Sequence, residues 1–312
     1  GQIMPPIMGA AAFLMAEFLG IKYAEVVKSA IIPAVLYFVG VFMGVHFEAK
    51  KLGLKGSPRD QLPKFSYILI QEGHLILPLI TIIYLLVSGF SLQFVALGSI
   101  IIAIVASFFR KATRISLKDF FEALEKGARS ALGVATACAT AGIIVGVVTK
   151  TGLGLKLASG LIVIASNLAV SIGGAIQSVK SFFYNLVGAT YTANPEILIS
   201  SLKIIFTLFM AMLTSIILGM GVPTTANYII TSTIAAPALL LLSVKPIAAH
   251  MFVFYFGIIA DITPPVALAA YAGAAIAKAD PFKTGVTATR LSIGAFIVPY
   301  MFVLAPQLLL LG

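Results

Sequence analysis

The sequence predicts an all-α integral membrane protein whose helices are interrupted at several places. Three observations lead to this fold class. The chain is 60% hydrophobic and only 10% charged, whereas a soluble domain is about one quarter charged. Its mean hydropathy is +1.08. Its apolar runs are long and continuous, which excludes a β-barrel, because barrel strands alternate polar and apolar residues.

The apolar runs divide the chain into membrane spans and shorter pieces. A spanning helix needs about 20 apolar residues, so 312 residues leave room for roughly eight to ten spans or half-spans. Full spans are expected at residues 24–47, 65–87, 92–109, 198–218 and 283–311. Shorter apolar helices are expected at residues 9–19, 247–260 and 266–279. We interpret the whole chain, residues 1–312, as a single transmembrane domain.

The formal net charge of +10 does not indicate nucleic-acid binding. Lysine and arginine cluster in the short segments 48–64 and 110–114, between apolar runs. Two spans separate these segments, so both lie on the same side of the membrane. Cytoplasmic loops carry an excess of these residues, so we place both in the cytoplasm. The expected partner is the lipid bilayer, and nucleic acid is excluded.

Residues 116–130 have the pattern of an amphipathic helix. Ser116 and Asp119 form a capping box. Apolar residues recur on one face, and the pairs Glu122–Lys126 and Glu125–Arg129 have i,i+4 spacing. One interpretation is a helix that lies in the membrane interface. The alternative is a short cytosolic helix that packs on the protein's own loops.

The region after this helix is predicted to be discontinuous. Residues 131–148 and 155–169 are two short apolar pieces, and Gly152 and Gly154 lie between them. Two short pieces joined by a glycine-containing turn indicate a re-entrant hairpin or a broken helix. Residues 171–195 are more polar, and we expect a loop with a partial helix there.

A first helix break is predicted at residues 219–227, inside an apolar run. Gly219 and Gly221 permit unusual backbone angles, and Pro223 blocks helical continuation. Lipid offers no partners for free backbone groups, so such a break is tolerated only inside protein or beside water. Thr224, Thr225 and Asn227 add side-chain oxygens there. This combination suits a cation or a polar solute. The alternative is a kink in a structural helix.

A second break is predicted at residues 260–265. Asp261 is the only acid between Glu196 and Asp280, and Thr263, Pro264 and Pro265 follow it. An intramembrane acid is by default a functional residue, as a cation ligand or a proton carrier. The alternative role for Asp261 is the N-cap of a helix that starts near Pro264.

The second break has a shorter counterpart at the start of the chain. Met4-Pro5-Pro6 followed by an alanine-rich helix is similar to Thr263-Pro264-Pro265 followed by another. Paired interruptions in corresponding halves point to a binding site between repeats. We therefore predict a partial inverted repeat. Residues 1–47 end the first copy, residues 48–130 connect the copies, and residues 131–312 form the second. The first copy lacks its front half, so we expect the natural chain to extend upstream.

Several stretches together resemble the large membrane subunit of tripartite ATP-independent periplasmic (TRAP) transporters. They are residues 219–228, 249–257 and 261–273, with further likeness at 1–9, 128–135 and 290–303. The branch in which the small and large subunits are fused looks closest. The resemblance implies a sodium-coupled importer of the elevator type in the inner (plasma) membrane of a bacterium or archaeon. It also implies a periplasmic solute-binding protein and a small four-helix membrane subunit or fused segment as partners.

The resemblance and the residue chemistry together suggest which residues bind the ion and the solute. Sodium is a hard cation that prefers oxygen ligands. The expected sodium ligands are the carbonyls of Gly219, Gly221 and Asp261 and the hydroxyls of Thr224, Thr225 and Thr263. The expected solute contacts are Pro223, Asn227, Pro264 and Pro265, with Gln2, Pro5 and Pro6 from the first copy. Half-helix N-termini at this site favour an anionic solute such as a carboxylate.

Two other functions stay open as alternatives. One is a permease that works without a binding protein, and the other is an assembly subunit that does not transport. An intramembrane enzyme would need a nucleophile with its base, or a set of metal ligands, and the sequence contains neither pattern. A Walker A motif is also absent, so ATP is not expected to drive the protein directly.

Overall fold

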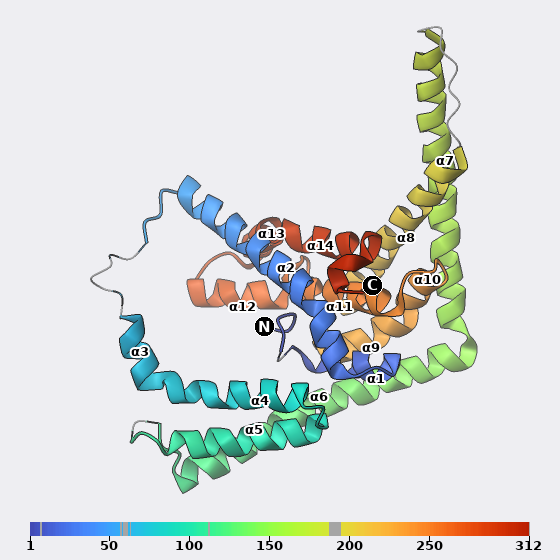
Figure 1. The fold of residues 1–312 in the computed structure, drawn as a ribbon. Helices are drawn as coiled ribbons and strands as arrows, with labels where there is room; N and C mark the ends of the chain where they lie inside the picture. The colour runs from blue at the N-terminus through green and yellow to red at the C-terminus, as the bar shows by residue number, and fades with distance from the viewer. Residues whose placement is uncertain are drawn as a thin grey trace. The chain divides into compact units, whose positions relative to one another are not determined.

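The computed structural model describes residues 1–6, 8–56, 58, 62, 64–111, 113–186 and 195–311. Within these ranges every regular element is a helix (Figure 1). Five of the described helices are long and apolar enough to cross a membrane, a bent helix pair is a sixth, and four apolar helices are shorter. The predicted polytopic helical architecture is therefore confirmed. The chain forms two compact units, residues 1–136 (unit 1) and 137–312 (unit 2).

Unit 1 holds one of its predicted spans as a continuous helix, one in two parts and one as a shorter helix. Its helices are α1 (Ala10–Leu19), α2 (Tyr23–Lys51), α3 (Phe65–Glu72), the 3-10 helix η2 (Gly73–Ile76), α4 (Leu77–Val87), α5 (Leu92–Ser107) and the start of α6 (Leu117–Thr151). Helix α2 confirms the span predicted at 24–47, whereas α5, with 16 residues at the place of the span predicted at 92–109, is one of the shorter apolar helices. The span predicted at 65–87 changes to 3-10 geometry at η2, just before Pro78, because proline lacks an N–H group and disfavours helix before it. Helices α4 and α5 pack side by side (Figure 1).

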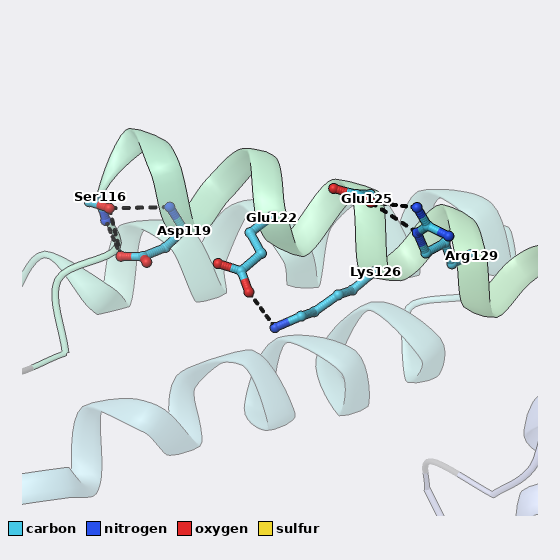
Figure 2. Close-up of polar contacts among 6 residues, drawn as sticks. All are labelled: Ser116, Asp119, Glu122, Glu125, Lys126 and Arg129. Carbon is cyan, nitrogen blue, oxygen red and sulfur yellow. Dashed lines mark hydrogen bonds and ion pairs between the residues drawn. The ribbon is translucent and has the colours of Figure 1, made fainter.

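The predicted capping box and both ion pairs are present at the start of α6. The Ser116 backbone N–H donates to Asp119 Oδ2 at 3.0 Å, and the Asp119 N–H donates to Ser116 Oγ at 3.1 Å. Lys126 lies 2.6 Å from Glu122, and Arg129 lies 2.9 Å from Glu125. Figure 2 shows these contacts along one helix. All four charged partners are largely exposed, so their stabilising effect is small.

The predicted end of this amphipathic helix is wrong. Helix α6 continues without interruption from Leu117 to Thr151, so residues 131–148 are not a separate short piece. Alanine, the strongest helix former, is frequent in this stretch and outweighs the cost of its glycines. The helix ends where Gly152 adopts a φ of +65°, a left-handed conformation that only glycine adopts readily.

The loop predicted at residues 171–195 is also wrong over most of its length. Helix α7 runs from Leu153 to Leu186, and Asn194 lies outside the described residues. The polar residues of this stretch tolerate a helix because α7 packs along the next helix, α8 (Pro195–Gly219). Gly173 allows the close approach, since a Cβ there would lie 3.0 Å from Ile199 Cγ1. No re-entrant hairpin forms between α6 and α7 among the described residues; α7 pairs with α8 (Figure 1).

Unit 2 is built around one almost completely buried helix. Its remaining helices are α9 (Thr224–Ile234), α10 (Ala236–Leu240), α11 (Pro246–Ile259), η3 (Ala260–Ile262), α12 (Leu268–Ala277), α13 (Pro281–Leu291), α14 (Ile293–Leu304) and η4 (Pro306–Leu309). Helix α11 packs against α8, α9 and α14. Phe252, Phe254, Tyr255 and Phe256 on α11 are each at most 1% exposed. This aromatic helix anchors the neighbouring segments, because buried aromatic side chains contribute the most contact area.

The span predicted at residues 283–311 is bent rather than straight. Helices α13 and α14 meet at an angle of 41°. Ser292 lies at the junction, and its hydroxyl donates to the Ala288 carbonyl at 2.8 Å. A serine that bonds back to the preceding turn competes with the helical hydrogen bonds and bends the helix.

The two Pro-Pro motifs have the same local structure. In each, a backbone N–H bonds across the prolines at 3.3 Å, from Met8 to the Met4 carbonyl and from Ala267 to the Thr263 carbonyl. Met8 and Ala267 both have positive φ, +39° and +35°. A ten-residue helix follows each motif, α1 in one case and α12 in the other. This likeness supports the internal repeat; the inverted relation of its copies stays a prediction.

A tyrosine hydroxyl also reaches the second proline of each motif. Tyr23 Oη donates to the Pro6 carbonyl at 2.9 Å, and Tyr271 Oη donates to the Pro265 carbonyl. Proline has no N–H and ends the regular backbone hydrogen bonding locally. The tyrosine hydroxyls, on α2 and α12, donate the hydrogen bonds that these two proline carbonyls accept.

We expect Tyr23→Phe and Tyr271→Phe each to lower the free energy of unfolding by about 1 kcal/mol, because each removes one hydrogen bond to a carbonyl. The measurement is the thermal unfolding midpoint of the detergent-purified protein. Tyr84→Phe is the matched control, since Tyr84 is 68% exposed. An equal loss in the control would contradict the assigned role of the two hydroxyls.

A buried hydrogen bond joins α9 to α11 inside unit 2. Tyr228 Oη lies 2.7 Å from His250 Nδ1. Tyr228 is 1% exposed and His250 is 8% exposed. A buried polar group without a partner is costly, so this hydrogen bond stabilises the contact between the two side chains. The pair holds the helix that follows the first break against the central helix.

Tyr228→Phe should lower the free energy of unfolding by about 1–3 kcal/mol, because it leaves a buried imidazole nitrogen unpaired. The double variant Tyr228→Phe with His250→Leu should recover part of this loss, since neither partner then remains buried alone. Thermal unfolding measures both, with Tyr67→Phe as the exposed control. A double variant that is less stable than Tyr228→Phe would show that the unpaired imidazole is not the cause of the lost stability.

Candidate functional site

The first break, residues 219–223, lies between α8 and α9. Helix α8 ends at Gly219, and Gly221 has a φ of +72°. Pro223 is the residue before α9, with an extended backbone, and offers no side-chain cap. Glycine permits the left-handed turn and proline prevents α8 from continuing. The run predicted to break at this place therefore breaks, and the simple kink of one continuous helix is excluded.

Several polar groups in and after the first break are not used by the protein. The first N–H groups of any α-helix lack intrahelical acceptors. Among the described residues, no acceptor takes the backbone N–H groups of Thr224, Thr225 and Ala226. The hydroxyls of Thr224 and Thr225 are half-buried and make no hydrogen bond within the described ranges. The Gly219 carbonyl accepts one hydrogen bond, from the Val222 N–H at 3.3 Å.

The second break, residues 260–267, lies between α11 and α12. It passes through η3, then Thr263 in extended conformation, then the two prolines. The Thr263 hydroxyl donates to the Ile259 carbonyl at 2.8 Å. From α13, the Thr289 hydroxyl donates to the Ile262 carbonyl at 3.0 Å. The break is thus held from two sides by hydroxyl groups that satisfy its exposed carbonyls.

Asp261 lies in this second break and is half-buried. Its carboxylate forms no hydrogen bond or ion pair with any described residue. The N-cap alternative for Asp261 is wrong, because α12 begins at Leu268 and its N-cap is Ala267. The Pro-Pro sequence delays the helix start beyond the reach of the aspartate. Asp261 therefore remains available to a ligand.

The two breaks lie against each other. A Cβ placed on Gly219 would lie 3.0 Å from Ala260 Cβ, and one placed on Gly221 would lie 3.6 Å from Val266 Cγ1. The buried side chain of Asn227 connects them further, since its Nδ2 donates to the Gly257 carbonyl at 2.8 Å. The two interrupted segments, whose residues carry carbonyl, hydroxyl and carboxylate oxygens, therefore lie in contact.

The remaining predicted residues belong to unit 1. Gln2, Pro5 and Pro6 lie in the Pro-Pro motif at the start of the chain. The Gln2 carbonyl accepts the Gly9 N–H at 2.9 Å, so this motif folds back on itself. Their contribution to the same site stays a prediction.

Two supporting residues were missed by sequence reasoning. Gly257 follows a run of large aromatic residues on α11, and this contrast in size signals a close approach. Thr289 carries no such signal, because nothing in its neighbourhood on α13 relates it to a break 27 residues earlier. Within the described ranges, no group of three or more histidine, cysteine, aspartate or glutamate residues is placed to hold a metal ion. The donors at the breaks are mainly backbone and hydroxyl oxygens.

Comparison with known proteins places this arrangement in a family. The family model described as "Tripartite ATP-independent periplasmic transporter, DctM component" matches residues 1–312, the entire sequence. A search of curated proteins returned no match. The DctM component is the large membrane component of these transporters, which agrees with the resemblance seen in the helix breaks. The chain therefore belongs to the DctM family of tripartite ATP-independent periplasmic transporters.

Proposed function

We propose that the chain carries out sodium-coupled secondary import of a small carboxylate solute across the inner membrane. The observation that carries the proposal is the contact between two helix breaks whose residues carry carbonyl, hydroxyl and carboxylate oxygen atoms. Interrupted helices that meet inside a membrane protein are a common way to bind ions and substrates. Family membership supports transport as the general activity.

The proposed sodium ligands are oxygen atoms from both breaks. The carbonyls of Gly219, Gly221 and Asp261 and the hydroxyls of Thr224, Thr225 and Thr263 are the donor set. Hard cations prefer such ligands over nitrogen or sulfur. The half-buried carboxylate of Asp261 supports this assignment, because a charge within the membrane domain requires a compensating partner. Bound sodium would supply that compensation.

The proposed solute is an anion that approaches the start of α9. The unused N–H groups of Thr224, Thr225 and Ala226 are located there, together with the positive end of the helix dipole. Pro223, Pro264 and Pro265 would shape the contact surface beside them. A carboxylate is the simplest small organic group that fits these donors.

The remaining parts of the proposal concern partners and movement. A periplasmic solute-binding protein delivers the solute, and a small four-helix membrane subunit or fused segment completes the membrane part. The helices that carry the two breaks move together as an elevator. The sodium gradient, and not ATP, drives the cycle. The tripartite, ATP-independent family type supports the division of labour among components.

In proteoliposomes that hold the complete transporter and its binding protein, an inward sodium gradient should drive accumulation of the solute. The same gradient of potassium should not, because potassium is larger and the ligand set is proposed for sodium. The measurement is uptake of radiolabelled solute over time. Uptake that is equal with sodium and potassium would refute sodium coupling.

Thr224→Val and Thr225→Val should each raise the sodium concentration that gives half-maximal uptake by roughly tenfold, because each removes one oxygen ligand while preserving the shape of the side chain. Thr287→Val is the matched control on the exposed face of α13. Sodium titration of uptake measures the effect. If both variants titrate like the control, neither hydroxyl binds the ion.

A further inference from the structure

Asn227 occupies an unusual position between the two breaks. It lies in the first turn of α9, directly after the first break, and its side chain is 1% exposed. Its Nδ2 crosses to α11 and donates to the Gly257 carbonyl at 2.8 Å. Gly257 lies in the last turn of α11, directly before the second break. One side chain therefore joins the two interrupted segments.

Two glycines form the slot that holds this amide. A Cβ on Gly219 would lie 2.5 Å from Asn227 Nδ2, and a Cβ on Gly257 would lie 2.7 Å from the same atom. Atoms do not approach this closely without a shift, so only glycine fits at either position while the amide stays in place. The slot has one wall at the end of α8 and the other at the end of α11. The amide thus determines how close these two helix ends lie.

Within the described ranges, only one of the two polar atoms of the Asn227 side chain has a hydrogen-bond partner. Asn227 Oδ1 is buried and has no hydrogen-bond partner among the described residues. A buried acceptor without a donor destabilises the folded protein, and such features concentrate at functional positions. Packing alone would be served better by an apolar side chain in the slot. The donor at Nδ2 is the feature that requires asparagine.

We propose that Asn227 is a positioning residue that keeps the two breaks at the separation needed to bind one cation together. The proposal rests on the function proposed above, and it adds a role for a residue that supplies none of the proposed sodium ligands. Oxygen donors on two separate segments bind a cation tightly only when their spacing is held before the ion arrives. The Asn227–Gly257 hydrogen bond and the glycine slot provide that spacing. Without them, only the wider packing of α8 and α9 on α11 would limit the movement of one break relative to the other.

The test compares Gly257→Ala, Asn227→Ala and the double variant in the complete reconstituted transporter. Each single variant should raise the sodium concentration for half-maximal uptake by roughly tenfold. The double variant should be no worse than Asn227→Ala, because the three atoms nearest to a Cβ at Gly257 all belong to Asn227. Gly273→Ala, whose Cβ would meet nothing within 4 Å, is the control. Effects that multiply in the double variant would overturn the proposal.

The variant Asn227→Asp separates the effect of the hydrogen-bond donor from the effect of side-chain packing. Ionised aspartate has nearly the same shape but no hydrogen to donate, so at a pH at which it is ionised it should behave like Asn227→Ala. A wild-type sodium response in Asn227→Asp, with normal amounts of folded protein, would overturn the proposal. This variant also distinguishes positioning from general stability, because a change in sodium response at unchanged thermal stability is not expected of a purely structural residue.

Hydrogen–deuterium exchange tests whether Asn227 holds the two breaks together, without assuming which ion is bound. In Asn227→Ala, peptides that cover residues 257–268 should exchange faster than in the wild type, while peptides of α7 should not change. Unchanged exchange at 257–268 would overturn the proposal. If wild-type uptake does not depend on sodium, the proposed function fails, and the exchange result still decides whether Asn227 holds the two breaks together.

Discussion

A helix that ends inside an apolar environment exposes backbone groups that water cannot reach, and the structure of unit 2 follows from this constraint. Each released carbonyl or N–H group needs a partner from elsewhere in the protein or from a ligand. At the second break, Thr289, Tyr271 and Asn227 reach three such carbonyls. At the first break, the leading N–H groups of α9 keep no partner among the described residues. These backbone N–H groups without a partner in the described part of the chain are therefore located at the start of α9, where a ligand would bind them.

The rest of unit 2 makes this arrangement rigid enough to be useful. Helix α11 is buried on nearly all sides, with aromatic residues packed against α14. The Tyr228–His250 hydrogen bond ties α9 to the same helix. Both breaks are thus attached to one well-packed element rather than to flexible loops. Preorganised oxygen donors bind a cation better than mobile ones, because less ordering is needed on binding.

The breaks themselves could be predicted from sequence because glycine and proline act locally. Gly221 needs its left-handed angle and Pro223 cannot continue a helix, whatever surrounds them. The lengths of α6 and α7 could not be predicted in the same way. In α6 the frequent alanines outweigh the glycines, and in α7 packing against α8 outweighs the polar residues and glycines, as at Gly173 beside Ile199.

The sequence also does not predict which groups the side chains of Asn227 and Thr289 contact. The solute contact expected of Asn227 stays a prediction, but the sequence does not reveal that its Nδ2 donates to the carbonyl of Gly257, 30 residues further along the chain. Spacing within one helix does not reveal which carbonyl of another helix lies opposite. Thr289 illustrates the same limit, since only the folded chain brings it to Ile262.

The most direct test of the central claim is a cryo-electron microscopy structure of the complete transporter in sodium, compared with one in a large organic cation. The two breaks should remain in contact, and density for an ion should lie between them in sodium only. It should be surrounded by oxygen atoms of Gly219, Thr225 and Asp261 or their neighbours. Breaks that lie apart in both conditions, or sodium bound only at another place, would contradict the account.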